Sequence, residues 1–262
     1  MRRIALCADD FGSGPAVDAA ILDLAGARRI GAVSCLVGGP AFGADAPPLG
    51  ALRDRVDVGL HLDLASGRAA LAALLVASHV RLLDRAAVAG RLAAQLDRFE
   101  SAFGGPPDFV DGHQHVHALP VVRDTLVAEL RARYGDRRPA VRNTVSLAPR
   151  GPKARLLAVL GGAALRDALR KAGIAHNPDF AGVYDLRPGP SHHAYRARFR
   201  AWLAGATDGM LVLCHPGGEP PDAGDPIAPA RSREHAYLAS ADLERDCAEA
   251  GVDRVRFTAL AR

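Results

Sequence analysis

The chain alternates between short apolar runs and longer segments whose apolar residues recur at helical spacing. A short apolar run is typical of a buried strand, and a longer amphipathic run is typical of a helix. Strands predicted in this way cover residues 3–8, 32–37, 56–64, 108–111, 140–147, 180–185, 209–214 and 253–259. Helices are predicted over residues 15–29, 41–53, 85–103, 120–134, 153–172, 193–204 and 233–250, with a linker over 65–84.

About seven or eight strand–helix units therefore follow one another, with no break in composition between them. We expect a single domain over residues 1–262. Repeated units of this total length favour one parallel (β/α) barrel of the TIM-like kind. An open, doubly wound sheet is the alternative.

Composition narrows the classes of protein that the chain can belong to. Hydrophobic residues make up 49% of the 262 residues, which excludes a disordered protein. The net charge is +4, but the basic residues are scattered among acidic ones without a basic block, so we expect no nucleic-acid partner. No apolar run reaches the ~18 residues of a transmembrane segment, and the N-terminus lacks the pattern of a signal peptide, so we expect a cytoplasmic protein.

Polar residues that can bind ligands cluster at the ends of the predicted strands. Because the carboxyl ends of parallel strands meet at one face of a barrel, residues far apart in the sequence are expected to share a site there. The residues at or just after strand ends are Asp9, Asp10, His61, Asp63, Asp111, His113, His115, His117, Arg142, Asn143 and His215.

The densest cluster is the sequence DGHQHVH at residues 111–117. On an extended segment, alternate residues point the same way, so His113, His115 and His117 could share a face. Imidazoles combined with a carboxylate suit zinc or another divalent metal ion. The alternative is a polar, hydrogen-bonding loop without a metal.

Two further sites carry candidate metal chemistry. Asp9 and Asp10 are adjacent carboxylates at a strand end, so one can bind a metal ion while the other acts as a base toward water. A helix N-cap is the alternative for this pair. His61, in the sequence GLHLDL, is either a ligand or a core histidine.

Residues near the C-terminal half add a candidate acid and a candidate binding residue. His215 follows an apolar strand and precedes Pro and Gly, so it is either a proton donor at the rim of the site or a turn residue. Arg142 could orient a carboxylate or bind a substrate oxygen, or form a surface ion pair. The chain lacks the glycine-rich motifs of nucleotide-binding proteins, and no GxSxG elbow accompanies a triad, which disfavours both nucleotide binding and serine hydrolysis.

Four motifs, in this order, resemble those of the YdjC-like carbohydrate deacetylases: ADDFG at 8–12, GLHLDL at 59–64, DGHQHVH at 111–117 and CHPG at 214–217. That family includes chitooligosaccharide deacetylases and enzymes that deacetylate an N-acetylglucosaminyl group on a hopanoid lipid. The chain departs from the family pattern at Gly112, where a serine or a related residue is more common. The segment between His61 and His113 is also shorter than in chitooligosaccharide deacetylases.

The resemblance implies a distorted (β/α) barrel and one divalent metal ion, magnesium or zinc. It implies that Asp10, His61 and His113 are the metal ligands, that Asp9 is the catalytic base and that His215 is the catalytic acid. The residues expected to bind substrate are His115, His117, Arg142 and Asp63.

The implied reaction is hydrolysis of an N-acetylated amino sugar to acetate and a free amine, by attack of a metal-activated water. The family's substrates include both oligosaccharides and lipid-linked sugars, and a homodimer is compatible with the family. One alternative is a metal-dependent phosphoesterase, which would usually need two metal ions ~3.5–4 Å apart. The other is a non-catalytic sugar-binding protein, which one Trp and four Tyr would equip with few stacking platforms.

Overall fold

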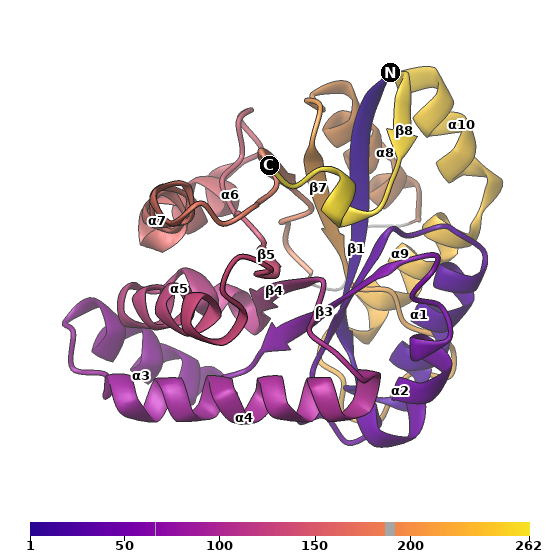
Figure 1. The fold of residues 1–262 in the computed structure, drawn as a ribbon. Coiled ribbons are helices and arrows are strands. Elements are labelled where there is room, and N and C mark those ends of the chain that lie inside the picture. Colours follow the sequence, from indigo (N-terminus) through magenta and orange to yellow (C-terminus); the bar gives the residue numbers. More distant parts are fainter. Residues whose placement is uncertain (66, 187–191) are drawn as a thin grey trace.

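In the described part of the chain, eight strands, all paired in parallel, form the curved centre of the molecule (Figure 1). The computed structural model describes residues 1–65, 67–186 and 192–262. The strands are β1 (Arg2–Phe11), β2 (Ala32–Cys35), β3 (Asp57–Leu62), β4 (Phe109–Gly112), β5 (Ala140–Val141), β6 (Asp179–Ala181), β7 (Met210–Cys214) and β8 (Val252–Arg254). Their order is β5-β4-β3-β2-β1-β7-β6, and β8 pairs with β1.

The two ends of this sheet approach each other. Val141 of β5 forms a parallel bridge with His176, which lies just before β6. The backbone N–H of Val141 also donates to the carbonyl of Ala175, at 2.9 Å. The sheet therefore curls almost into a closed cylinder, and the predicted distorted (β/α) barrel is confirmed.

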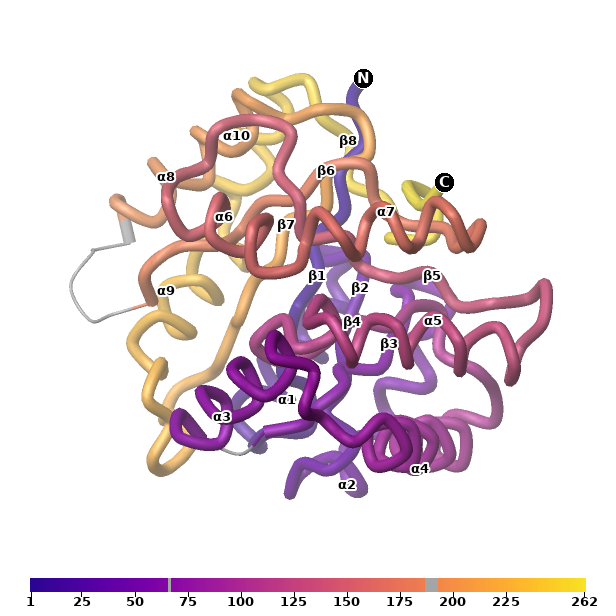
Figure 2. Tube along the Cα trace, turned by 90° about the vertical axis from the view of Figure 1, so that its left-hand side faces the viewer, coloured from indigo at the N-terminus to yellow at the C-terminus, as the bar shows by residue number. Residues whose placement is uncertain are grey.

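Helices surround the sheet (Figures 1 and 2). They are α1 (Pro15–Gly26), α2 (Phe42–Gly50), α3 (Arg68–His79), α4 (Arg85–Phe103), α5 (Pro120–Tyr134), α6 (Pro152–Leu157), α7 (Ala163–Ala172), α8 (His192–Ala204), α9 (Ala228–Ala239) and α10 (Ala241–Ala250). Short helical turns η1 (His113–Ala118), η2 (Ala158–Gly162) and η3 (Phe257–Ala259) complete the chain. None of the described helices combines the length and the apolar character needed to cross a membrane.

Several predicted boundaries need correction. The predicted linker over 65–84 contains helix α3, and the predicted helix over 233–250 is two helices. Ser240 separates α9 from α10, because its side chain accepts the N–H of Asp242 and begins the second helix. The predicted helix over 153–172 is interrupted at Gly161, whose φ of 153° and close approach to the carbonyl of Ala118 exclude a side chain.

The alternation of side chains along β1 explains how the barrel interior leads to the site. Ala5 and Cys7 point into a small inner cluster that includes Phe109 and Phe257, whose rings meet edge to face with centroids 4.9 Å apart. Ile4, Leu6 and Ala8 point outward to the larger core beneath the helices. A side chain two residues beyond Cys7 therefore faces the interior at the carboxyl end of the strand. That residue is Asp9.

Candidate metal centre and active site

The backbone at the end of β1 turns Asp9 and Asp10 in different directions. Asp10 has a φ of 73°, in the left-handed region that residues other than glycine seldom adopt. The pairing of β1 with β2 shifts register between Ala8 and Phe11 at the same place. This bulge breaks the strand alternation, so that the two adjacent carboxylates have separate partners.

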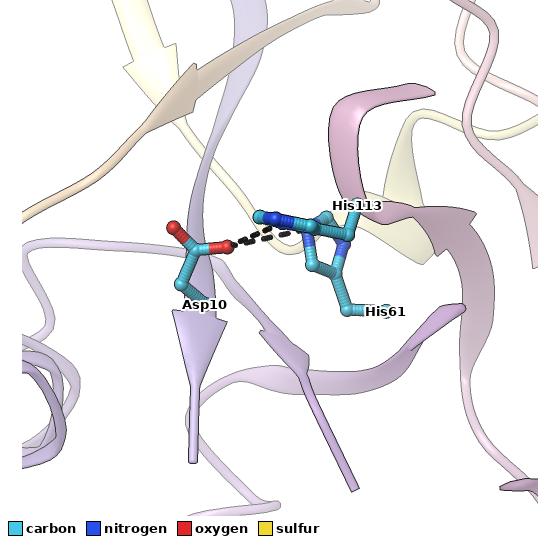
Figure 3. Close-up of side chains that lie close together, drawn as sticks. All are labelled: Asp10, His61 and His113. Carbon is cyan, nitrogen blue, oxygen red and sulfur yellow. Dashed lines mark hydrogen bonds and ion pairs between the residues drawn. The ribbon is translucent and has the colours of Figure 1, made fainter. Parts of the chain in front are cut away.

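Asp10 lies together with His61 of β3 and with His113, which begins η1 directly after β4 (Figure 3). Its Oδ1 is 3.0 Å from Nδ1 of His113 and 3.5 Å from Nε2 of His61. The candidate ligand atoms of the three residues all lie within 4.8 Å of one another. Two imidazoles and a carboxylate, converging on one point, fit the donor set of a catalytic zinc-type site that keeps an open position. The structure thus brings together the three predicted ligands, which we call the DHH group.

A second carboxylate, Asp111, orients His61. Asp111 lies directly opposite His61 in the register between β3 and β4, and its Oδ1 is 2.6 Å from Nδ1 of His61. Ser34 donates to the same oxygen at 2.5 Å. This contact directs Nε2 of His61 toward Asp10, as in the carboxylate–histidine pairs that support metal ligands.

The electrostatics of this group favour a positive charge. Burial lowers the pKa of His61, but the charges of Asp111 and Asp9 and hydrogen bonds to carboxylates outweigh it and raise the pKa to about 10. Burial raises the pKa of Asp10, yet hydrogen bonds from His113 and His61 and the charge of Arg231 hold it well below its usual range. The carboxylates around His61 therefore stabilise a positive charge at the DHH group. A proton on His61 supplies this charge, and a bound metal ion would replace that proton.

Asp9 is held by a buried arginine. Arg142 reaches its two oxygens with Nη1 at 2.7 Å and Nη2 at 2.5 Å. Nη2 of Arg142 also lies 2.5 Å from Oδ2 of Asp111. Burial raises the pKa of Asp9, but the ion pair with Arg142 lowers the pKa by more than burial raises it. The carboxyl group therefore stays ionised. Arg142 therefore lies behind Asp9, fully buried, and fixes its orientation.

A cavity of about 590 Å³ opens above these residues. Asp9 and the DHH group line one part of it, together with His115, His215 and Arg231. Its remaining wall is largely aliphatic, and Tyr184 is the one Phe, Tyr or Trp among the described lining residues. The aliphatic members are Leu156, Leu157, Val183, Leu186, Leu213, Pro226 and Ile227.

Two more of the predicted site histidines line this cavity. Nδ1 of His115 and Nδ1 of His215 are both buried and lack a hydrogen-bond partner among the described residues. Burial, helped by the nearby His117, holds the pKa of His115 well below its usual value, so the ring is neutral. The backbone N–H of His215 donates to Glu234 at 2.7 Å, and the hydroxyl of Tyr184 donates to the same carboxylate at 2.6 Å.

Three residues that were expected to bind substrate do not line the cavity. His117 is fully buried, with Nε2 3.0 Å from the carbonyl of Arg142, and burial lowers its pKa to about 4. Its ring departs from those of His113 and His115 because Gln114 and His115 both have positive φ, so the segment is not extended as predicted. Arg142 lies behind Asp9, and the carboxylate of Asp63 accepts the N–H of Ala65. All three side chains contact other parts of the protein in this structure, and their expected contact with a substrate stays a prediction.

Other contributors were missed in the sequence. Asp111 was recognised as a strand-end residue, but its pairing with His61 depends on strand register, which the pattern of residues does not define. Arg231 and Glu234 lie on α9. From the sequence, Arg231 was expected in a loop and Glu234 at the start of a helix, and neither was predicted to take part in the site. Only their positions in the folded chain show that they contact Asp10 and His215.

The amino-acid sequence of the chain is similar to that of a known family of proteins. The sequence profile described as YdjC-like protein matches residues 3–249. A carbohydrate deacetylase of Mus musculus is 36% identical over 168 residues, which cover 56% of this chain and 53% of the relative. A chitooligosaccharide deacetylase of Yersinia pestis (strain Pestoides F) is 41% identical over 49 residues, 19% of each chain. The chain thus spans about half the length of the animal relatives that it matches.

A solved structure supports the fold along the whole chain. It is a protein from Enterococcus faecalis V583, provisionally named a cellobiose-phosphate cleavage protein, with a TM-score of 0.72. The comparison covers 100% of this chain and 99% of the other, at 18% identity. Similarity at that identity establishes a shared fold, and function has to be argued from the site.

Proposed function

Because the chain belongs to the YdjC-like family, we propose that it is a hydrolase that removes the N-acetyl group from an N-acetylated amino sugar and depends on one divalent metal ion. The observation that carries this proposal is the position of Asp9 beside the DHH group in a single cavity. Metal ligands next to a candidate base are what metal-assisted hydrolysis requires.

In this proposal, Asp10, His61 and His113 hold the ion. Their mixed nitrogen and oxygen donors suit zinc or another first-row divalent ion better than magnesium, which is usually bound through oxygen. When bound, the ion supplies Lewis-acid chemistry and lowers the pKa of coordinated water.

The protein's own residues move the protons. Asp9, kept ionised and oriented by Arg142, accepts a proton from water as the water oxygen attacks the acyl carbon. His215 donates a proton to the sugar nitrogen as the C–N bond breaks, and its backbone is fixed for this by Glu234. The products are acetate and the free amino sugar.

The cavity supports a substrate that is polar at one end and apolar beyond it. The acetamide fits beside the DHH group, whereas the largely aliphatic wall offers few surfaces for stacking further sugar rings. An amino sugar attached to an apolar aglycone, such as a lipid-linked sugar, therefore fits this wall better than a long chito-oligosaccharide.

The same geometry disfavours the two alternatives. Besides the DHH group, the described residues contain one other cluster with metal-ligand spacing, formed by Cys7, Asp9 and Asp111. The guanidinium of Arg142 contacts all three of its members, so this cluster offers no open position for the second metal ion of a phosphoesterase. Tyr184 alone among the lining Phe, Tyr and Trp residues makes a poor sugar-stacking platform for a non-catalytic binding protein.

The test is acetate release. Purified protein, stripped with a chelator and reloaded with zinc or magnesium, is incubated with chito-oligosaccharides, with alkyl glycosides of N-acetylglucosamine and with lipid-linked forms. We expect metal-dependent acetate release, fastest for a substrate with an apolar aglycone. His113→Ala should remove the activity, whereas His79→Ala, at an exposed histidine outside the cavity, should keep it. No release from any substrate by metal-loaded protein would refute the proposal.

A further inference from the structure

The two oxygens of Asp10 have different environments. Oδ1 faces the imidazoles of His113 and His61, at 3.0 and 3.5 Å. Oδ2 accepts a hydrogen bond from Nη2 of Arg231, at 2.7 Å. Only one oxygen of the carboxylate is thus directed at the place where the metal ligands converge.

Arg231 is itself firmly held. It is 7% exposed, and its Nε donates to Oδ2 of Asp225 at 2.7 Å. Oδ1 of Asp225 accepts the N–H of Ile227 just before α9, so this carboxylate is fixed as well. The loop after β7 packs against the Arg231 stem so closely that a Cβ at Gly217 would lie 2.9 Å from it. A side chain restrained at both ends keeps its contact with Asp10.

We propose that Arg231 is a positioning residue that makes Asp10 a one-oxygen metal ligand. A carboxylate can bind a cation through one oxygen or through two. With Oδ2 occupied by Arg231, Asp10 takes a single coordination position, and further positions stay open for water and for the acyl oxygen of the substrate. This inference rests on the proposed metal-dependent function and assigns a role that the family motifs do not include.

The positive charge of Arg231 distinguishes the proposed role from that of a residue that simply strengthens metal binding. A guanidinium beside a metal ligand repels the metal ion, so its presence does not strengthen metal binding. Asp111, by contrast, adds a negative charge behind His61 and favours the ion. Removal of Arg231 should therefore lower activity without weakening metal binding.

The experiment uses Co²⁺, whose visible absorption is stronger at low coordination number than at high. The wild-type protein, Arg231→Gln and the control Lys153→Gln are loaded with Co²⁺, and the bound metal is measured. Lys153 also lines the cavity as a cation, but its ammonium group contacts Tyr184 and Asp185 and not Asp10. The double variant Arg231→Gln/Asp225→Asn, which removes both members of the buried pair, replaces the single variant if the latter does not fold.

We expect a weaker cobalt absorption per bound ion in the Arg231 variant, because Asp10 then binds through both oxygens. Its Kd for Co²⁺ should be equal to or lower than that of the wild type, while kcat falls by about 10–100-fold, as for other residues that support metal ligands. The control should keep the wild-type spectrum. An unchanged spectrum in the fully loaded variant would overturn the role of Arg231 alone, whereas failure of the wild type to bind Co²⁺ would overturn the proposed metal-dependent function.

Discussion

Replacement of Asp111 by Asn tests how the fold prepares His61 to bind a metal ion. The change keeps the shape of the side chain but removes the charge that lies 2.6 Å from Nδ1 of His61. It also lets the ring adopt the tautomer in which Nε2 carries the proton and faces Asp10. Both effects weaken the proposed DHH centre, while the side chains of Asp10 and His113 stay in place.

The size of the effect follows from the contacts. Loss of a carboxylate that supports a metal-binding histidine typically lowers metal affinity by about 10–100-fold, or about 1.4–2.8 kcal/mol. Asp111 also pairs with the fully buried Arg142, so we expect the metal-free variant to lose about 1–3 kcal/mol of unfolding free energy. Arg142 keeps Asp9 as a partner, which limits this second loss.

The assay is competition for Zn²⁺ against a chromophoric chelator, with folding checked by thermal denaturation of the metal-free proteins. Ser34→Ala is the matched control, because it removes a hydroxyl that neighbours both Asp111 and Nδ1 of His61 and leaves the contact between Asp111 and His61 intact. A smaller loss of affinity is expected for that control. Wild-type Zn²⁺ affinity in a folded Asp111→Asn protein would refute the argument that Asp111 prepares His61.

Three other predictions concern turnover, pH and packing. Asp9→Asn should remove turnover and leave metal binding intact, as shown by metal content and acetate assays on the same sample. Burial raises the pKa of Asp18 to about 8, so its contribution to stability is complete below the unfolded pKa of about 4 and is lost as the pH rises toward 8. The wild type should lose up to about 1.4 kcal/mol of unfolding free energy per pH unit, and Asp18→Asn should remove this loss. Urea denaturation of both proteins at pH 5 and pH 8 measures the difference. Gly59→Ala should cost about 1–3 kcal/mol of unfolding free energy, because a Cβ there would lie 2.5 Å from the buried Phe109 ring.

Each of these has an outcome that would count against it. Substantial acetate release by Asp9→Asn would show that another group is the base. Parallel pH profiles of stability for the wild type and Asp18→Asn would show that this carboxyl is ionised in the folded state. An unchanged urea midpoint for Gly59→Ala would show that the Phe109 ring can move aside.

Helices with a clear apolar stripe and an end signal could be predicted closely from the sequence. Helix α4 has the predicted bounds, because Val88, Leu92, Leu96 and Phe99 bury one face and Gly104 ends it in the left-handed conformation. Helix α3 was missed because its sequence, rich in Ala and Leu, does not alternate between an apolar and a polar face. The helix also buries little of itself, since Ser78 is its one buried residue.

The grouping of the candidate site residues was predictable where residues follow strands and not where contacts depend on register or loops. Asp10, His61 and His113 come together because the carboxyl ends of β1, β3 and β4 meet. The prediction that His113, His115 and His117 share one face is wrong for His117. Gln114 and His115 both adopt the left-handed conformation, which the sequence pattern did not indicate. The contact of Arg231 with Asp10 spans 221 residues and has no local signal.

The most direct test of the account is a metal titration of activity. Zn²⁺ is added in small increments to the stripped protein, and acetate release from an alkyl N-acetylglucosaminide is measured at each step. If the DHH group forms the one proposed metal centre, activity rises linearly with added Zn²⁺ and stops rising at one ion per chain. A rise that continues to two ions per chain, or no acetate at one bound ion, would contradict it.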